Sequence, residues 1–462
     1  MKVLKFGGSS LKSGEAMRRV CRIIANDDEW KVVIVSALSG VTEELIQFVS
    51  QLRKEEEVEA FIRTMEEKHA SLIRESVDNE AIRKAACAKV TEKITRLERA
   101  LYGFCYLEEL TPRTKDIVQS LGERLSVVVV AAALQDIGVK GVGIDADELG
   151  IITDGVYGGA TADLESTRKH VAPKIRTMFD RGETPVITGF FGRTEEGHVT
   201  IFGRNGSDYS AAVIANVLNA DSLEIWKDVD GFMSVDPKIV KEAVAIEALS
   251  YDEAAELSYF GAQVLHPRTV EPARMKNITI YVRNVFKPEL KGTAIQPSGV
   301  QRAQTIKSIS FMKNMAIIKV YGAGAGTKTG VMSEISTKLT EAGVNIYSAA
   351  TSQTCIAFLV SKNDLPIAEK ALEQSKKGVI EKIETVQDIA LLCVVGEGLG
   401  YEKGIAARVF SAVASEGVSV NMISAGASLV AYHFTVDKKD LERTIRAIHK
   451  EFFDSHGPYP EA

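Results

Sequence analysis

Two glycine-rich stretches decide the fold: Lys5-Phe6-Gly7-Gly8-Ser9-Ser10 and Phe202-Gly203-Arg204-Asn205-Gly206-Ser207-Asp208. Each stretch stands between a β-like apolar run and a helix-like run. At such a junction, glycines let backbone N–H groups approach phosphate oxygens, and the helix N-terminus adds partial positive charge. Junctions of this kind are typical of layered α/β sheets, which bind ligands at the carboxyl ends of their strands.

Working outward from these stretches, strand-like and helix-like runs alternate over about the first 300 residues. The expected strands are Val3–Phe6, Val32–Val35, Gly141–Asp145, Thr184–Gly189, Ser222–Trp226 and Ile278–Val282, and the expected helices include Gly14–Ala25 and Ser207–Leu218. Apolar residues at helical spacing from Lys54 to Leu101 predict a helical hairpin within an insertion at about 54–120. Gly122-Glu123-Arg124 is placed at a helix start, ahead of the apolar run Arg124–Leu134. The pattern predicts one large α/β domain over residues 1–300.

The remainder of the chain contains an internal duplication. Ala316–Val320 is followed by spaced glycines and then Gly343–Ile346, and Ala390–Val394 is followed by the same spacing and then Gly417–Val420. Gly343 and Gly417 correspond at an offset of 74 positions. Each copy predicts the ferredoxin-like order βαββαβ. We expect the two modules at 301–385 and 386–462, with the alternative left open that the C-terminal segment completes the first module.

Composition excludes several classes of protein. The formal net charge of −6 comes without a dense basic cluster, so nucleic acid is not an expected partner. No apolar run is expected to reach the length needed to cross a membrane. Five scattered cysteines without a CxxC pair favour reduced thiols over a disulfide framework or a zinc site. The N-terminal strand-like run leaves no room for a signal peptide, so we expect a cytoplasmic protein.

Lys5 and Asp208 are the first candidates for chemistry. Lys5 precedes the glycines, so its stretch is not a P-loop, but a lysine beside such a turn supplies a full positive charge for a phosphate. The alternative is a tight turn with a surface lysine. Ser207 or Asp208 is placed to cap the following helix, and a purely structural cap is the alternative for Asp208. Arg204 beside this turn favours an anion site.

Two further sets could bind small molecules. Trp226-Lys227-Asp228-Val229-Asp230-Gly231, followed by Lys238, ends a strand in acidic residues at a turn, as at a nucleotide-binding edge. A calcium loop is disfavoured because the later ligands of an EF-hand are missing, and a plain hydrophilic turn remains open. Ser36–Thr42 and Glu123, with Arg204, could hold an amino acid zwitterion. His266 is interpreted as a hydrogen-bonded structural residue, and no histidine is given a catalytic role.

Taken together, these motifs resemble the aspartate kinases of the amino-acid kinase superfamily. In chain order, they are KFGGSS at 5–10, SALSGVT at 36–42, GER at 122–124, ITGFFGR at 187–193, FGRNGSDYSAA at 202–212, WKDVDG at 226–231, VDPK at 235–238 and ELSYFGAQVLHPRT at 256–269. The resemblance covers nearly the whole chain, and the duplicated half looks like paired ACT domains. It implies a three-layer α/β sandwich with a mostly parallel central sheet, followed by two ferredoxin-like ACT domains. The catalytic part looks nearest to the kinase portion of aspartokinase–homoserine dehydrogenase, and no dehydrogenase is expected after Ala462.

The resemblance implies a role for individual residues. Lys5 and Asp208 match the catalytic pair of the family. The aspartate pocket would consist of Ser36, Thr42, Glu123, Phe190 and Arg204, with Arg204 on the α-carboxylate and Glu123 on the α-ammonium group. ATP would lie along Gly7, Gly8, Ser9, Lys227, Asp228, Asp230, Gly231 and Lys238. Mg²⁺ would arrive with ATP, without direct ligation by side chains.

This chain departs from the family pattern at three positions. Gln263 replaces the lysine of FGAKVLHP, which puts one nucleotide contact in question. Lys227 stands where threonine is common, and Met233 replaces a frequent tyrosine. All three changes bear on nucleotide affinity. The change of Thr-Ser to Ser9-Ser10 keeps a hydroxyl group.

The ACT-like half implies regulation by an amino acid. Effector contacts would come from Gly326 and Gly330 in the glycine-rich loop and from Val344, Asn345 and Ile346 in the following turn. Lysine or threonine would be the effector, and the modules would pair the chain into a homodimer or a dimer of dimers. The family's usual Ser-Glu is absent after both Ala350 and Ser424. A purely dimerising role for the modules is therefore the alternative.

Two rival functions remain. A kinase for glutamate, acetylglutamate, carbamate or UMP is disfavoured by the tandem repeat and by SALSGVT and GER. A non-catalytic amino-acid sensor is disfavoured by the presence of both Lys5 and Asp208. The first reaction to expect is phosphoryl transfer from ATP to the side-chain carboxylate of aspartate.

Overall fold

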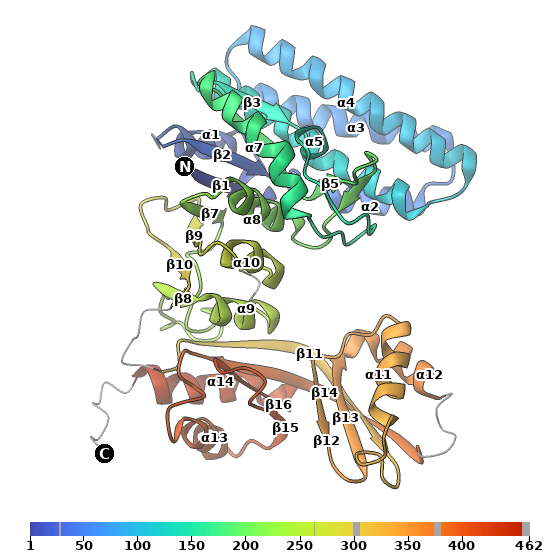
Figure 1. The fold of residues 1–462 in the computed structure, drawn as a ribbon, viewed down its shortest axis with the longest axis vertical. Coiled ribbons are helices and arrows are strands. Elements are labelled where there is room, and N and C mark those ends of the chain that lie inside the picture. The colour runs from blue at the N-terminus through green and yellow to red at the C-terminus, as the bar shows by residue number, and fades with distance from the viewer. Residues whose placement is uncertain (27–28, 263, 299–304, 374–379, 455–462) are drawn as a thin grey trace. The chain divides into compact units, whose positions relative to one another are not determined.

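The computed structural model describes residues 1–462 except 27–28, 263, 299–304, 374–379 and 455–462. The chain forms two compact units, and Figure 1 shows the elements of each. The first unit comprises Met1–Phe232, Glu247–Tyr251 and Val264–Gly299, and the second comprises Met233–Ile246, Asp252–Gln263 and Val300–Ala462.

The first unit is built on an eight-stranded sheet in the order β3-β4-β2-β1-β7-β9-β10-β8. The strands are β1 (Lys2–Phe6), β2 (Lys31–Val35), β3 (Gly141–Ile144), β4 (Thr184–Thr188), β7 (Ser222–Lys227), β8 (Ala248–Ser250), β9 (Thr279–Asn284) and β10 (Thr293–Gln296). All neighbouring pairs are parallel except β9 with β10. A separate hairpin pairs β5 (Phe191–Arg193) with β6 (Val199–Ile201). The predicted mostly parallel sheet is confirmed.

Helices cover both faces of this sheet, which completes the predicted three-layer sandwich. One face is covered by α7 (Leu164–Asp180), α8 (Gly206–Leu218) and α10 (Pro267–Arg274). The other carries α1 (Gly14–Ala25), α2 (Val41–Gln51) and α5 (Pro112–Asp136), with α3 (Glu55–Ser76) and α4 (Glu80–Leu107) packed against this layer. Helices α3 and α4 form the predicted hairpin and lie side by side in Figure 1.

The predicted start of the helix at Gly122 is wrong. Helix α5 begins at Pro112, and the Thr111 hydroxyl oxygen accepts a hydrogen bond from the Thr114 N–H. A threonine before proline is an ordinary helix-start signal, because threonine caps and proline fits the first helical position. Glu123 and Arg124 therefore lie in the middle of a long buried helix, which fixes their positions more firmly than a helix end would.

Helix α5 also corrects the expectation about apolar runs. By length and composition it is apolar enough to cross a membrane, the one such helix in the described part of the chain. However, 89% of its apolar window is buried inside the fold. A core helix passes this test as readily as a membrane span does, because both are apolar on all sides.

The second unit contains the duplicated modules in one six-stranded antiparallel sheet, ordered β12-β13-β11-β14-β16-β15. Its strands are β11 (Ser308–Tyr321), β12 (Ser348–Thr351), β13 (Cys355–Ser361), β14 (Lys382–Val395), β15 (Val420–Ser424) and β16 (Ala431–Asp437). Its helices are α9 (Tyr251–Tyr259), α11 (Val331–Glu341), α12 (Leu365–Glu373), α13 (Ile405–Ser415) and α14 (Leu441–His449). The first residue of α9, Tyr251, is still assigned to the first unit. The predicted ferredoxin-like order βαββαβ is complete in the first copy, as β11-α11-β12-β13-α12-β14. Among the described residues the second copy runs β14-α13-β15-β16-α14, and β11 lies in the sheet position of its last strand.

The two copies share their long strands. Ile306 and Ile309, which precede the first repeat, pack in the core of the second copy, while Ile380 packs in the core of the first. The C-terminal helix α14 packs through Leu441 and Ile445 in the second core and does not complete the first. Because β11 and β14 each serve two cores, neither copy is a self-contained segment of sequence.

Candidate active site

The glycine-rich loops meet at one edge of the first sheet. Strands β4, β2, β1 and β7 are consecutive and parallel, so their carboxyl ends lie at the same edge. The loops after β1, β2 and β4 carry Gly7, Ser36 and Phe190, and β7 ends at Lys227. This edge is where ligands bind in open α/β sheets.

A buried ion cluster stands at this edge. The Lys5 Nζ atom lies 2.5 Å from Asp208 Oδ1, and the Lys227 Nζ atom lies 2.9 Å from Asp208 Oδ2. Lys5 and Asp208 are only 5% and 2% exposed. Two cations share one carboxylate, so the cluster has an excess of positive charge suited to an anionic ligand.

The pKa values reflect this arrangement. Burial by itself raises the pKa of Asp208, but Lys5 and Lys227 outweigh it and lower the pKa to about 2. Burial lowers the pKa of Lys5; the Asp208 carboxylate opposes that effect and the Lys227 cation adds to it. Asp208 is therefore ionised throughout the neutral range and holds the two ammonium groups together.

The expectation that Ser207 or Asp208 caps α8 is wrong. Asn205, with φ of 56°, is the N-cap residue, and no side chain provides a capping hydrogen bond. Asp208 lies within the first helical turn, where a carboxylate also favours the helix dipole, and its oxygens face Lys5 and Lys227. The geometry gives Asp208 an ion-pairing position in place of a cap.

The predicted substrate residues converge on one cavity of about 700 Å³. Its walls include all five residues of the predicted aspartate pocket, namely Ser36, Thr42, Glu123, Phe190 and Arg204, together with Gly8, Ser9 and Ser207. These residues come from loops and helices that are far apart in the sequence. Their convergence is the property that a small-molecule site requires.

Glycines allow the walls of the cavity to approach each other. A Cβ atom on Gly8 would lie 2.7 Å from the carbonyl oxygen of Ala37, and one on Gly122 would lie 2.7 Å from the Ala37 Cβ atom. Gly7 lies beside the ion cluster, since a Cβ atom there would be 3.7 Å from Lys5 Nζ. The loops after β1 and β2 and helix α5 can approach this closely only with hydrogen in place of a side chain at Gly8 and Gly122.

Phe190 has a strained backbone at the cavity wall. Its φ angle is 75°, although it is neither glycine nor asparagine. The Phe190 N–H donates to Ser210 Oγ at 2.9 Å, and the Phe190 carbonyl oxygen accepts from the Phe202 N–H at 2.8 Å. Such strain persists where surrounding contacts over-determine it, and it is common at ligand sites.

Glu123 carries a buried carboxyl group in this cavity. It is 2% exposed, and its Oε2 atom has no hydrogen-bond partner. Burial raises the pKa of Glu123 to about 8, although a backbone hydrogen bond from Ala37 and the positive charge of Lys5 act in the opposite direction. A buried, unpaired oxygen of this kind is suited to a cationic or hydrogen-bond-donating ligand.

Arg204 supplies the opposite charge. It is exposed at the rim of the same cavity, and among the described residues its guanidinium group has no ion-pair partner. Thr42 lies in the first turn of α2, and the Ser36 carbonyl oxygen accepts from Ser126 Oγ at 2.7 Å. The cavity thus presents an acid, a cation and hydroxyl groups, which is a set of groups that can hold a zwitterion.

Other predicted nucleotide residues do not line this cavity. Asp230 accepts hydrogen bonds from Asn284 and from Lys287, whose Nζ lies 2.7 Å away, and Asp228 is exposed. Gly231, with φ of 112°, packs against Thr293, where a Cβ atom would lie 2.4 Å from the hydroxyl oxygen. Lys238 and Met233 belong to the second unit, and Gln263 lies outside the described residues. Among the described residues, no group of three or more acidic, His or Cys side chains is placed to hold a metal ion.

The predicted effector residues lie in the second unit. A Cβ atom on Gly326 would lie 1.8 Å from the Ser352 carbonyl oxygen, and Gly330 is the N-cap of α11 with φ of 92°. Val344 is buried and Ile346 is half-buried. The Asn345 side-chain amide donates to the Tyr259 hydroxyl at 3.5 Å. The glycine-rich loop thus packs closely against a neighbouring backbone at Gly326, whereas a Cβ atom on Gly330 or on Gly343 would meet nothing within 4 Å.

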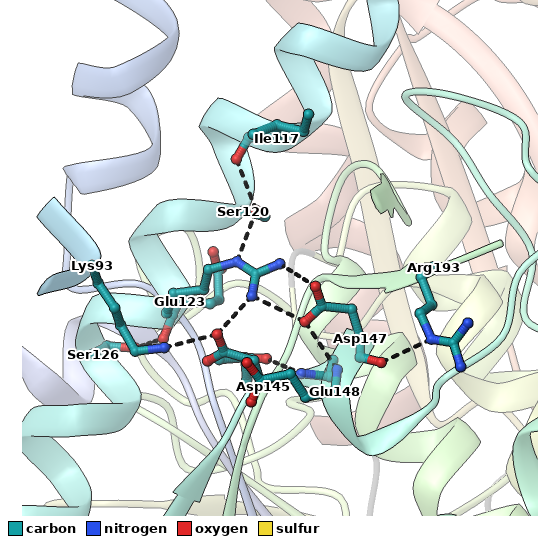
Figure 2. Close-up of polar contacts among 12 residues, drawn as sticks. Lys93, Ile117, Ser120, Glu123, Ser126, Asp145, Asp147, Glu148 and Arg193 are labelled. Atoms are coloured by element: carbon teal, nitrogen blue, oxygen red, sulfur yellow. Dashed lines mark hydrogen bonds and ion pairs between the residues drawn. The ribbon is translucent and has the colours of Figure 1, made fainter. Parts of the chain in front are cut away.

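Sequence reasoning missed several features. Gln119 and Asn205 also line the cavity, and Gln119 stands four residues before Glu123, so helical spacing was the available signal. A buried network around Arg124 was also missed, in which Arg124 pairs with Asp145 and Asp147, and Lys93 of α4 pairs with Asp145 (Figure 2). The structural interpretation of His266 is confirmed, because its ring nitrogen accepts from the Arg268 N–H at the start of α10.

Comparison with known families shows where this architecture belongs. A family model described as the amino acid kinase family matches residues 1–284. Two ACT-domain models match residues 310–374 and 392–452. The Arabidopsis thaliana protein aspartokinase 1, chloroplastic is 33% identical over 98% of this chain and 80% of its own length. The bifunctional aspartokinase/homoserine dehydrogenase of Haemophilus influenzae is 28% identical over 98% of this chain and 57% of its own length.

Solved structures share the fold. Escherichia coli aspartokinase III in complex with aspartate and ADP has a TM-score of 0.83 at 24% identity, with 98% of this chain and all of that chain covered. The same enzyme with lysine and aspartate matches equally well. The aspartate kinase of Clostridium acetobutylicum has a TM-score of 0.81 at 26% identity, again with 98% of this chain covered.

The buried Glu123 predicts a pH-dependent stability difference. The unfolded chain loses this proton near pH 4.5, whereas the folded chain keeps it up to about pH 8. The fold is therefore penalised increasingly between these values. Glu123→Gln carries no charge and escapes this penalty. The excess of its unfolding free energy over that of the native protein should therefore grow by about 2 kcal/mol from pH 6 to pH 8.

Denaturant unfolding of both proteins across this pH range measures the difference. Glu109→Gln, at an exposed glutamate, is the matched control and should show no such trend. Parallel pH profiles for the native protein and Glu123→Gln would contradict the prediction.

Proposed function

Because this chain belongs to the aspartokinases of the amino acid kinase family, we propose that it transfers the γ-phosphoryl group of ATP to the β-carboxylate of L-aspartate, giving 4-phospho-L-aspartate and ADP. This reaction is the first step toward lysine, threonine and methionine. The observation that carries the proposal is the convergence of Ser36, Thr42, Glu123, Phe190 and Arg204 on one cavity, at the sheet edge where the Lys5–Asp208–Lys227 cluster also lies.

The cavity would hold aspartate by its charged ends. Arg204 would bind the α-carboxylate, and Glu123 would bind the α-ammonium group. Because burial raises the pKa of Glu123 to about 8, an incoming ammonium group would favour the ionised form of this carboxyl group. Ser36 and Thr42 would donate hydroxyl hydrogen bonds, and Phe190 would close the wall. The β-carboxylate is then left to face the phosphate.

The phosphate groups would lie against the loop after β1 and the ion cluster. Gly7, Gly8 and Ser9 would offer backbone N–H groups, while Lys5 and Lys227 would neutralise the transferring group. Asp208 would hold both ammonium groups in place. Asp228, Asp230 and Gly231 would extend the nucleotide site.

Mg²⁺ would arrive with ATP and would be bound mainly by the ATP phosphates. Its chemical contribution would be to offset phosphate charge. No general base is required, since the aspartate side chain is already ionised at neutral pH. Catalysis then reduces to alignment and charge neutralisation.

The second unit would regulate the kinase. Gly326, Gly330, Val344, Asn345 and Ile346 would contact an amino-acid effector, and lysine and threonine are the two candidates. Escherichia coli aspartokinase III, which shares this fold, was solved with lysine. We further propose a cytoplasmic homodimer or dimer of dimers paired through the modules.

The first test is ATP-dependent and Mg²⁺-dependent formation of acyl phosphate, trapped as the hydroxamate. Aspartate should give product and glutamate should not, because the extra methylene group of glutamate would move its side-chain carboxylate out of line with the phosphate when both charged ends are held. Added lysine or threonine should inhibit, and the inhibitory amino acid identifies the effector. No product with any carboxylate would favour a non-catalytic sensor.

Lys5→Ala should lower kcat by about 100-fold or more, because Lys5 acts mainly on charge that develops in the transition state. The aspartate KM should change little. Lys12→Ala, at an exposed lysine shortly after the same loop, is the matched control. Near-normal turnover in Lys5→Ala would exclude the proposed role.

Arg204→Ala should raise the aspartate KM by about 10-fold to 100-fold through loss of a charge-assisted contact, with the ATP KM little changed. Steady-state kinetics with each substrate varied in turn separates the two effects. An unchanged aspartate KM would refute this arrangement of the pocket.

A further inference from the structure

Arg124 is the largest fully buried side chain of the structure and stands at the centre of an ion network. Its Nη1 atom donates to Asp145 Oδ2 at 2.6 Å and to Asp147 Oδ1 at 3.0 Å, and its Nη2 atom donates to Asp147 Oδ2 at 2.7 Å. Nε donates to Ser120 Oγ at 3.3 Å. Lys93 of α4 adds a second cation, with Nζ 2.7 Å from Asp145 Oδ2 (Figure 2).

The network fixes the helix that carries Glu123. Arg124 follows Glu123 directly in α5, and its fork is held by the segment after β3 and by the short helix α6 (Ala146–Leu149). A planar guanidinium group bound at several points leaves α5 little freedom to rotate or slide. The depth of the Glu123 carboxyl group in the cavity therefore depends on the contacts of Arg124.

The same network fixes both sides of Phe190. The Ala146 N–H donates to Thr188 Oγ1 at 2.7 Å, just before Phe190 in the chain. The guanidinium group of Arg124 lies 4.4 Å over the ring of Phe191, just after it. Arg193 Nε donates to the Asp147 carbonyl oxygen at 2.9 Å. These contacts hold the chain on both sides of Phe190 and so can maintain its strained φ angle of 75°.

Stability alone does not account for this network. Burying charged groups costs several kcal/mol per ion, and well-packed apolar residues of similar volume are often as stable or more so. What an apolar cluster lacks is directionality, because dispersion contacts do not fix the rotation of a helix as a forked set of hydrogen bonds does. The network is therefore suited to holding a geometry.

We propose that Arg124, through Asp145 and Asp147, is a positioning residue that sets the separation of Glu123 and Phe190 and thereby the fit of the cavity to its amino-acid substrate. Arg124 does not line the cavity and does not touch the substrate. The inference rests on the proposed function, because it assigns Glu123 and Phe190 to the aspartate site. It goes beyond that function by locating the control of substrate fit in a buried network behind the wall.

Arg124→Lys is the decisive variant, because lysine keeps the charge and loses the fork. It should raise the aspartate KM by about 10-fold, with kcat within about threefold and the ATP KM within about twofold of the native values. Asp147→Asn, which keeps the shape of the side chain, should shift the aspartate KM in the same direction. If Arg124→Lys fails to fold, Asp147→Asn provides the test of the proposal in its place.

Arg283→Lys is the matched control. Arg283 also lies 4.4 Å over an aromatic ring, that of Trp226, and pairs with Glu224, yet it does not line the cavity. This variant should leave the aspartate KM within about twofold of the native value. A rise equal to that of Arg124→Lys would reduce the effect to the general loss of an arginine that stacks on a ring and pairs with a carboxylate, and it would overturn the proposal.

A double-mutant cycle tests whether Arg124 acts through Glu123. If it does, Arg124→Lys should add little to the aspartate KM once Glu123 is already glutamine. Fully additive effects, or an unchanged aspartate KM in a folded Arg124→Lys protein, would overturn the proposal. Absence of aspartate-dependent product in the native protein would instead refute the proposed function, so the two failures are distinguishable.

Discussion

The ion pair between Lys5 and Asp208 is the constraint on which the first unit depends. Lys5 lies on the inner strand β1, and Asp208 lies in the first turn of α8, on one face of the same sheet. Both side chains are almost fully buried, and breaking such a pair from one side costs about 3–5 kcal/mol because the remaining charge is left uncompensated. The position of α8 over β1 is therefore tied to this contact. Lys227 on the neighbouring strand β7 shares the carboxylate, so the ends of both strands and the helix N-terminus are held together.

Three buried charged sites in this unit differ in how their charge is balanced. The cluster at Asp208 has an excess cation, which suits a phosphate. The network at Arg124 and Lys93 is neutral, because Asp145 and Asp147 balance its two cations, which suits a structural role. Glu123 differs from both, because it has no ion-pair partner among the described residues and its Oε2 atom lacks a hydrogen-bond partner. In a well-packed interior, an unpaired carboxyl oxygen is costly unless a ligand completes it. The balance of charge thus distinguishes the residues suited to bind ligands, at Asp208 and Glu123, from the network at Arg124 that is suited to position them.

Much of this was predictable from the sequence, and the failures have physical reasons. Periodicity and glycine-rich turns located six of the eight strands of the sheet and the helices α1, α3, α4 and α8, because these signals are local. They did not locate the short strands β8 and β10 or the helices α2, α7 and α10. The start of α5 was placed too late because the apolar run from Leu125 is a stronger helix signal than the Thr111-Pro112 pair that begins the helix. Asp208 was taken for a cap because nothing local reveals that Lys5, distant in the sequence, lies opposite. The Arg124 network and the strand sharing of β11 and β14 depend wholly on tertiary contacts, which no local pattern encodes.

The shared strands have a consequence for how the second unit can respond to a ligand. Since β11 and β14 each run through both cores, a shift in one copy must be taken up by the other or by the irregular pairing between Met312 and Ile317. Helix α9 is bound to this unit through Glu253, which is fully buried and whose Oε2 accepts from Lys307 Nζ at 2.8 Å while Oε1 accepts from the Glu397 N–H at 2.6 Å. Lys307 stands one residue before β11, and Glu397 two residues after β14. A movement of either strand end must therefore carry α9 with it or break a buried ion pair, and α9 is continuous in sequence with β8 of the first unit.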